Sequence, residues 1–417
     1  MNVESLKHCH GFTKTAPFPI KALYVHIPFC AGRCSYCDFF SVSAQEHPQF
    51  FSHDRQMLYI DAVLEQARCW SQEFNAGPFS TIYIGGGTPS VLGEDALERL
   101  LRGLAPYAME GCEWTIEANP ESVDRSLLDM LAASNVTRIS LGVQTLSSEA
   151  WPVLQRVGDV EKSKETIELV KEYPFELSAD LLLGIPLRQG HTGTEKNAFL
   201  ESLTYLAERL SHISVYDLTL EEGAPLHRQV TCGALVAPSA DELAQARDEA
   251  EALLSNYGFR RYEVSNYARD GHECKHNAAY WNMAPYLGLG SAAVSTIQYP
   301  EDEESPRLGC MIRTTGGKNI EQYMAAPTEI SEPTEFIDRN TALFEFLMMG
   351  FRTSRGVDTQ RIASLFGLDV AQIIPNSLAR WRKEIIRTDR HIALRPRSFD
   401  ILNRFLVECL EEMEERK

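Results

Sequence analysis

The sequence lacks any long hydrophobic run. No apolar stretch approaches the roughly 20 residues that a helix needs to cross a bilayer. This excludes a membrane-spanning helix but leaves peripheral contact with a membrane open. The first residues, 1–20, contain no continuous apolar core of the kind found in secretory signals. We therefore expect a cytoplasmic protein, whose ten cysteines are metal ligands or buried thiols rather than disulfides.

Positive charge is scarce. The chain has 40 Lys and Arg against 58 Asp and Glu, a net charge of −18. A partner with a phosphate backbone favours a basic face, so this balance argues against nucleic acid. From residue 340 to the end there are 13 basic and 11 acidic residues, a local balance of +2. That balance is typical of a solvated, arginine-rich surface, and we expect no specific binding of duplex DNA there.

Internal repeats and low-complexity tracts are also absent, which argues against a repeat array. The 417 residues, 44% of them hydrophobic, suffice for one large domain and a smaller one. Apolar strand-like segments alternate with helical patterns, at 22–28, 80–84, 113–118, 137–143, 177–184 and 213–219. This alternation predicts an α/β fold whose parallel sheet is buried on both faces, as an open doubly wound sheet or an incomplete barrel. In both, chemistry gathers at the C-terminal ends of the strands.

The same pass along the chain predicts its domain organisation. Residues 1–20 read as a tail and 21–296 as the α/β domain. The segment 297–309 is acidic, holds two prolines and shows no period, so 297–329 reads as a linker or insertion. Residues 330–417 combine helical patterns with a short strand, which predicts a mainly helical, winged-helix-like domain.

Three cysteines crowd one short stretch, at Cys30, Cys34 and Cys37. Buried structural thiols are seldom this dense. One reading is a structural zinc site, which normally closes with four ligands and could take His26 or Asp38 as the fourth. The other is a [4Fe–4S] cluster, which usually takes four thiolates, so three would leave one iron open to a small molecule.

Glycines and polar residues follow the strands that surround this stretch. The run GGGTPS, Gly85 to Ser90, comes directly after a strand, and glycines let backbone groups approach a ligand closely. A simple turn would need only one glycine. Other polar side chains lie on or at the ends of successive strands and are suited to bind a ribose, an amine and a carboxylate. They are Glu117, Gln144 and Asp180, with Arg156 as a cation.

Together these motifs resemble the radical S-adenosylmethionine (SAM) superfamily. The resemblance rests on C-x3-C-x2-C after a first barrel strand, with Tyr36 before the third cysteine and Tyr24 ahead of the loop. It implies an incomplete (β/α)6 radical SAM barrel, a [4Fe–4S] cluster on Cys30, Cys34 and Cys37, and SAM bound to the open iron. The residues that it places around SAM are Tyr24, Tyr36, Gly86, Gly87, Thr88, Glu117, Gln144, Arg156 and Asp180.

Within the superfamily, nearly the whole chain is similar to the HemN-like family, in which two branches compete. Oxygen-independent coproporphyrinogen III oxidases decarboxylate porphyrinogen propionates and carry a further cysteine two residues after the third, where this chain has Phe39. The heme-chaperone branch keeps the fold but binds heme and passes it to acceptor proteins. CDFFS is similar to the C-D-F-N-S of that branch. We therefore predict a heme chaperone with an unknown acceptor, with a porphyrinogen decarboxylase as the alternative and RNA modification disfavoured by the charge.

A second stretch, HNAAYW from His276 to Trp281, is similar to the H-N-x-x-Y-W motif of the heme-chaperone branch, within a heme or substrate region near 262–296. The resemblance implies that His276 is a heme ligand, with Cys274 as a weaker candidate. On residue types alone, a packed His–Trp core cluster is favoured. The chain departs from the family pattern at Phe40, Gly158 and Asp217, where the family has asparagine, histidine and glutamine.

Overall fold

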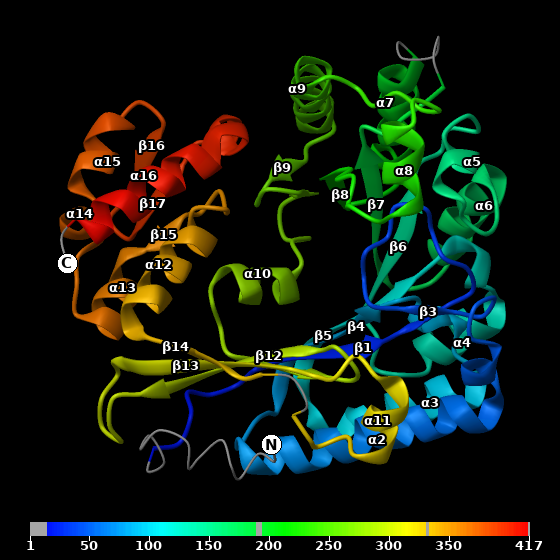
Figure 1. Ribbon diagram of the computed structural model, residues 1–417, viewed down its shortest axis with the longest axis horizontal. Helices are drawn as coiled ribbons and strands as arrows, with labels where there is room; N and C mark the ends of the chain where they lie inside the picture. The colour runs from blue at the N-terminus through cyan, green and yellow to red at the C-terminus, as the bar shows by residue number, and fades with distance from the viewer. Residues whose placement is uncertain (1–14, 189–193, 331–332, 416–417) are drawn as a thin grey trace.

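The computed structural model describes residues 15–188, 194–330 and 333–415 (Figure 1). Its main feature is one 12-stranded sheet, and the six predicted strands form its centre as consecutive parallel neighbours. They are β1 (Ala22–Ile27), β4 (Phe79–Gly86), β5 (Ala108–Ala118), β6 (Arg138–Gln144), β7 (Glu176–Leu183) and β8 (His212–Asp217). Helical segments join each strand to the next. The predicted α/β fold of six strand–helix units is therefore confirmed.

Helices cover the outer face of these strands (Figure 1). They include α2 (His53–Glu73), α3 (Glu94–Leu104), α4 (Arg125–Ala132), α6 (Val160–Val170) and α7 (Thr194–Ala207). In α3 the buried residues Leu97, Leu100, Leu101 and Leu104 recur at three- and four-residue spacing, so one stripe faces the sheet. Among the described residues, no helix combines the length and the apolar composition required to cross a bilayer.

The sheet does not close into a complete barrel within the described part of the chain. After β8 the next neighbour is β10 (Asn266–Ala268), which is antiparallel to it and pairs in turn with β9 (Arg260–Arg261). At the other side, β1 pairs in parallel with β11 (Tyr286–Leu289), a strand that the sequence pattern did not predict. The incomplete barrel is thus extended at both edges.

Three antiparallel strands follow β11, and they correct the reading of 297–309 as a linker or insertion. They are β12 (Val294–Pro300), β13 (Leu308–Thr315) and β14 (Glu335–Ile337). Ile297 and Leu308 are fully buried, whereas residues 301–304 are exposed. The linker reading is wrong at both ends of the segment, because apolar residues join the sheet there and only the acidic turn stays in solvent.

The chain before β1 and after β13 also packs on the barrel. Phe18 donates its backbone N–H to the carbonyl oxygen of Gln298 at 2.8 Å, and Ile20 is buried, so ordered chain begins before residue 21. Helix α11 (Ile320–Ala325) lies against α2, where the Tyr323 hydroxyl donates to Gln66 at 2.8 Å. Residues 1–14 of the predicted tail lie outside the described residues.

The C-terminal part builds a second hydrophobic core. Its helices are α12 (Arg339–Gly350), α13 (Thr359–Phe366), α14 (Val370–Ile373), α15 (Pro375–Arg380) and α16 (Leu402–Glu414). A three-stranded antiparallel sheet flanks them, formed by β15 (Val357–Asp358), β17 (His391–Leu394) and β16 (Ile385–Arg387). Asp338 and Asp358 cap the N-termini of α12 and α13, and Gly367 ends α13 in a left-handed conformation. The helical module with a wing-like strand agrees with the prediction.

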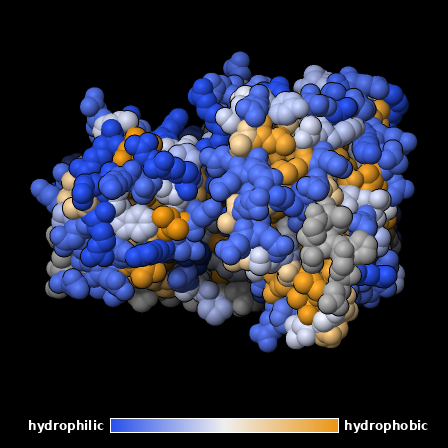
Figure 2. Space-filling model, turned by 90° about the horizontal axis from the view of Figure 1, so that it is seen from above, coloured by the Kyte–Doolittle hydropathy of each residue, from blue (hydrophilic) through white to orange (hydrophobic). Residues whose placement is uncertain are grey.

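Helix α10 (Lys275–Trp281) lies between the barrel strands and the C-terminal helices (Figure 1). Arg361 of α13 donates to the carbonyl oxygens of Asn282 and Met283, just after α10. Arg313 of β13 forms an ion pair with Glu345 of α12 at 2.7 Å. Figure 2 shows a largely hydrophilic surface whose outline narrows between the C-terminal part and the barrel.

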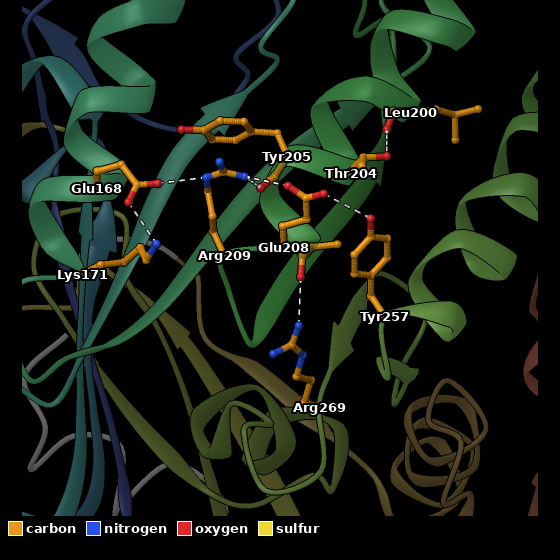
Figure 3. Close-up of polar contacts among 10 residues, drawn as sticks. Glu168, Lys171, Leu200, Thr204, Tyr205, Glu208, Arg209, Tyr257 and Arg269 are labelled. Atoms are coloured by element: carbon orange, nitrogen blue, oxygen red, sulfur yellow. Dashed lines mark hydrogen bonds and ion pairs between the residues drawn. The ribbon is translucent and has the colours of Figure 1, made fainter.

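Polar contacts join the outer helices to one another (Figure 3). Arg209 donates to Glu168 of α6 at 2.9 Å and to Glu208 at 3.0 Å, and its guanidinium lies 3.8 Å from the ring centroid of Tyr205. The hydroxyl of Tyr257, after α9 (Ala240–Asn256), donates to Glu208 at 3.3 Å. Because the two carboxylates are exposed, each ion pair contributes less than about 1 kcal/mol.

Candidate functional site

The three motif cysteines line one cavity of about 410 Å³ at the C-terminal ends of the barrel strands. Cys30, Cys34 and Cys37 are all partly buried free thiols. Within the described ranges, no three His, Cys, Asp or Glu side chains are gathered so as to hold one metal ion. A zinc ion needs ligands that converge at about 2.3 Å from sulfur, whereas an iron–sulfur cube is wider and takes thiolates spread around it. The loop brings three thiols to one cavity, which is the number that a cluster with one open iron requires.

The cysteine loop is fixed by its neighbours. Its strand β2 (Phe29–Cys30) pairs with β3 (Val42–Ser43), which closes the loop. Between Cys34 and Tyr36 the buried Ser35 donates its hydroxyl to the carbonyl oxygen of Val153 at 2.7 Å. Burial raises the pKa of the Cys37 thiol to about 11. The Cys37 thiol is therefore protonated at neutral pH, so binding of iron to it must release a proton.

The glycine run lies against the cysteine loop, and close contacts explain all three glycines. A Cβ on Gly85 would lie 2.7 Å from the Glu117 carboxylate, and one on Gly87 would lie 2.7 Å from the carbonyl oxygen of Phe29. Gly86 has φ +111°, and a Cβ there would lie 2.4 Å from the His26 ring. A turn with a single glycine would not require three consecutive positions without a side chain. The run therefore allows the end of β4 to pack closely against Glu117, His26 and the start of the cysteine loop.

Two partly buried carboxylates lie beside the glycines. Glu117 accepts hydrogen bonds from the Tyr83 hydroxyl at 2.7 Å and from the Gly86 N–H at 3.0 Å. Burial raises the pKa of Glu117 to about 7 and that of Asp180 to about 6. Both line the cavity, where a cationic ligand would restore their ionised form.

Arg156 connects the cysteine loop with two strand ends. Its guanidinium donates to the Tyr36 hydroxyl at 3.1 Å, to Asn119 Oδ1 at 3.0 Å and to the carbonyl oxygen of Gly142 at 2.6 Å. It also lies 4.0 Å from Cys34 Sγ. Only its Nε, among the guanidinium nitrogens, is buried without a partner in the described structure. Arg156 thus holds the loop in addition to facing the cavity.

Gln144 carries backbone strain at the end of β6. Its φ of +67° lies in the left-handed region, and the β6–β7 register shifts between Gly142 and Gln144. A non-glycine residue pays on the order of 1 kcal/mol for this conformation, and such strain clusters at functional sites. Here the bulge turns the Gln144 side chain into the cavity lining.

The cavity thus brings together most of the predicted site. Lining it are Cys30, Cys34, Tyr36, Cys37, Gly86, Gly87, Thr88, Glu117, Gln144, Arg156 and Asp180. Tyr24 and His276 are not among its lining residues. Tyr24 lies behind it, with its hydroxyl 2.9 Å from His26 Nδ1 and its ring stacked on Tyr83.

His276 is buried behind a column of aromatic rings. Its ring centroid is 5.1 Å from that of Tyr83 and 4.7 Å from that of Tyr280. Its Nδ1 is 2.9 Å from the Thr81 hydroxyl, and its buried Nε2 has no partner among the described residues. Burial lowers the pKa of His276 to about 3, so the imidazole is neutral. Its packing partners are tyrosines rather than the tryptophan of the predicted His–Trp cluster.

Glu113 of β5 positions the helix that carries His276. The residue before α10, Cys274, makes no side-chain cap, and Glu113 takes over that role from a distant strand. Its carboxylate accepts from the backbone N–H groups of Lys275 and His276, both at 3.0 Å. Cys274 itself is buried and lies 3.5 Å from Glu113.

Sequence reasoning missed Asn119 and Tyr216. Asn119 donates to the Thr88 hydroxyl at 3.1 Å and accepts from Arg156, so it joins the glycine run to the arginine. Its place two residues after Glu117 at a strand end could have revealed it. Tyr216, near the end of β8, lines the cavity that contains the three motif cysteines and also a second cavity.

The second cavity, of about 570 Å³, lies between the barrel and the C-terminal part. Its volume is typical of ligand pockets, which span about 300–1,000 Å³. Its lining includes a group of aromatic and thioether side chains, namely Tyr216, Tyr280, Trp281, Met283, Tyr286, Met348 and Met349, together with the charged residues Glu263, Arg313 and Glu345. Trp281 is further fixed by a hydrogen bond with the buried Glu263. His276 is not among the lining residues.

Comparisons with known proteins assign this arrangement to a family. The Radical SAM superfamily matches residues 24–190 and the HemN C-terminal domain matches residues 337–397. Heme chaperone HemW of Lactococcus lactis subsp. lactis (strain IL1403) is 31% identical over 400 residues, which cover 92% of this chain and 97% of the relative. This chain belongs to the HemW family of radical SAM proteins. Heme chaperone HemW of Mycobacterium tuberculosis (strain ATCC 25618 / H37Rv) is 34% identical over 284 residues, 67% of this chain and 70% of the relative.

A solved structure extends the likeness to the fold. The coproporphyrinogen III oxidase HemN from Escherichia coli, a radical SAM enzyme, matches with a TM-score of 0.75 at 19% identity. The match covers 97% of this chain and 93% of the other. The HemW-family chain therefore shares the architecture of HemN over both its barrel and its C-terminal part.

Membership in the radical SAM superfamily implies a [4Fe–4S] cluster and SAM, and the cavity of this HemW-family chain fits both. Three thiols surround one end of the cavity. The carboxylates of Glu117 and Asp180 lie in the same lining, where they can meet the positive charge of SAM. The glycine run leaves no side chain between the cysteine loop and β4.

The positions at which this HemW-family chain departs from the pattern have local explanations. Phe39 is 69% exposed and lines the cluster cavity. The carbonyl oxygen of Phe40 is 3.0 Å from His26 Nε2, which a change of side chain leaves intact. Gly158 has φ +84°, and a Cβ there would lie 3.2 Å from Glu121, so this backbone favours glycine over histidine. Asp217 forms an ion pair at 2.6 Å with Arg247 of α9.

Proposed function

We propose that this chain is a heme chaperone that binds a [4Fe–4S] cluster, SAM and heme and passes heme to an acceptor protein. The observation that carries the proposal is the aromatic and thioether-lined cavity of about 570 Å³, which shares Tyr216 as a wall with the cluster and SAM cavity. The curated relatives named heme chaperone HemW support it. A flat, apolar tetrapyrrole is a ligand that such a lining favours.

Cys30, Cys34 and Cys37 would hold the cluster, and Glu117, Gln144 and Asp180 would orient SAM. When bound, the cluster supplies a one-electron donor, and SAM supplies a sulfonium group that can accept the electron. The protein holds the loop through Arg156, whose hydrogen bond to Tyr36 at 3.1 Å fixes the residue between two cysteines. Phe39 contributes an exposed apolar side chain to the cavity lining where the oxidase branch has a thiol.

Heme would occupy the second cavity, with Tyr280 and Trp281 against its faces. His276 remains our proposed ligand or nearby residue, and its partnerless Nε2 is the atom available to iron. Because Tyr280 packs on its ring at 4.7 Å between centroids, direct ligation requires Tyr280 to move. Cys274 is a weaker candidate, since burial raises the pKa of its thiol to about 12.

The test is an anaerobic titration with hemin of wild type, H276A and the control H53A, whose exposed histidine lies on α2. We expect wild type and H53A to bind one heme with the same absorption spectrum. H276A should bind at least about tenfold more weakly, with a shifted Soret band. Equal spectra and affinities for all three would remove His276 from the heme site. No heme binding by wild type would contradict the proposed function.

A parallel assay addresses the alternative, an oxygen-independent coproporphyrinogen III oxidase. Wild type with a reconstituted cluster is incubated anaerobically with SAM, a reductant and coproporphyrinogen III. We expect no decarboxylated product, because Phe39 replaces the cysteine that the oxidase branch carries. Formation of protoporphyrinogen would establish the oxidase in place of the chaperone.

A further inference from the structure

A third cavity, of about 400 Å³, adjoins the proposed heme cavity and has a different chemistry. Basic side chains contribute to its lining, namely Arg355, Arg361, Arg390 and His391, with Asp358 as the acidic residue. The three arginines and one aspartate give a formal charge of +2. In a chain of net charge −18, this is a local reversal of sign.

The basic residues of this cavity differ in whether they already have a hydrogen-bond or ion-pair partner. Arg390 forms a two-nitrogen contact with one carboxylate oxygen of Asp358, at 2.9 and 2.7 Å. Arg361 donates to backbone carbonyl oxygens after α10 and therefore joins the domains. Arg355 is exposed and makes no hydrogen bond or ion pair with the residues described. It is the cation of this cavity that remains available to an anion.

Two elements form a common wall between this cavity and the heme cavity. Trp281 lines both. Helix α12 presents Met348 and Met349 to the heme cavity and Phe346 and Gly350 to the basic one. A ligand with a flat apolar body and acidic groups on one edge could therefore place its body in the heme cavity and its acidic groups in the basic cavity, next to Trp281, which lines both.

We propose that the basic cavity is the subsite for the propionate carboxylates of heme, with Arg355 as the main contact and Arg390 and His391 beside it. The proposal rests on the heme chaperone function proposed above. The macrocycle lies in the aromatic and thioether-lined cavity, and the carboxylates extend past Trp281 to the arginines. A guanidinium binds a carboxylate through two parallel hydrogen bonds, which would fix the orientation of the macrocycle.

The experiment compares hemin with hemin dimethyl ester, whose propionates carry no charge, on the full-length anaerobic protein. Wild type, R355E, R355K and the control R382A are titrated with both ligands. Arg382 is an exposed arginine of the same domain that lies outside the basic cavity. Melting curves confirm that each variant is folded.

We expect wild type and R382A to bind hemin at least about tenfold more tightly than the ester. R355E should lose this preference by weakening hemin binding alone, and R355K should retain most of it. Equal affinity of wild type for the two ligands, or equal loss of both in R355E, would overturn the propionate subsite and leave the chaperone function standing. Binding of neither ligand by wild type would overturn the function and the subsite together.

Discussion

At the scale of single residues, the site combines thiols, carboxylates and one arginine whose roles follow from their partners. Glu117 is held by Tyr83 and by a backbone N–H of the glycine run, and Arg156 is held by Tyr36, Asn119 and Gly142. The polar groups nearest to the cysteines, by contrast, lie at long distances: the Thr88 hydroxyl is 3.7 Å from Cys30 Sγ, and the Arg156 guanidinium is 4.0 Å from Cys34 Sγ. The cysteines are therefore the groups that depend most on an added metal centre.

Replacing any one motif cysteine by alanine should abolish the cluster. Two thiolates are too few to retain a cube that already has one open iron. The measurement is iron and sulfide content with the visible absorbance of C30A, C34A and C37A after anaerobic reconstitution. C69A, which changes a partly buried cysteine of α2 outside the cavity, is the control and should keep its iron. One zinc and no iron in the wild-type protein would contradict the cluster.

Glu117 should make the apoprotein less stable as pH rises. Its folded pKa of about 7 lies above its unfolded value of about 4.5, so the folded state binds a proton that the unfolded state releases between these pH values. The free energy of unfolding should fall by about 2–3 kcal/mol from this group between pH 4.5 and pH 7.

Urea denaturation of wild type and E117Q across this pH range measures the effect. The neutral amide cannot titrate, so the variant should show a flatter pH dependence. Parallel curves for the two proteins would show that Glu117 does not retain its proton in the folded state.

At the scale of elements, helix α10 is held at its N-terminus by Glu113, a residue of strand β5. Glu113 accepts from two of its first backbone N–H groups, both at 3.0 Å, and so places a negative charge at the positive end of the helix dipole. The same helix carries Tyr280 and Trp281, which line the proposed heme cavity, and His276, which is buried behind Tyr280. Loss of the cap therefore affects stability and heme binding together.

E113A should lower the free energy of unfolding by about 1–2 kcal/mol, because two helix N–H groups lose their acceptor. It should also weaken hemin binding by disordering the first turn of α10. E110A, an exposed glutamate on the same strand, is the matched control. Denaturation and hemin titration of the three proteins test this, and equal behaviour of E113A and E110A would contradict the cap.

At the scale of the whole molecule, the barrel and the C-terminal part meet around α10, and Arg361 links them. It donates to the carbonyl oxygens of Asn282 and Met283, and burial lowers its pKa. Both proposed heme cavities lie at this junction. Residues of both parts line these two cavities, so the packing at the junction fixes their shape.

R361A should loosen the junction. The exposed carbonyl oxygen of Asn282 loses its donor, whereas that of Met283 keeps a hydrogen bond from Gln298 Nε2 at 2.7 Å, so the cost is about 0.5–1.5 kcal/mol. Hydrogen exchange of the α10 amides should become faster in R361A, while R382A should match wild type. Unchanged protection of α10 in R361A would show that other contacts hold the two parts together.

The sequence alone determined the features that rest on local patterns. The six strands follow from continuous apolar runs, and the cysteine and glycine loops from short motifs that carry their own chemistry. These residues reach one cavity because the C-terminal ends of parallel strands meet at one edge. The end of a strand also predicted Glu117, and Asp180 was predicted as a polar residue inside an otherwise apolar strand.

Only the tertiary structure decided the rest, because it depends on residues far apart in the chain. β11 and the hairpin of β12 and β13 joined the sheet through burial of Ile297 and Leu308, which the acidic turn between the strands concealed. Tyr216 and Trp281 became shared walls, and Glu113 became a helix cap, through packing between elements that no local periodicity records. His276 is likewise buried behind Tyr280. Its position depends on how α10 packs against β4 and the rest of the core, which the local motif does not record.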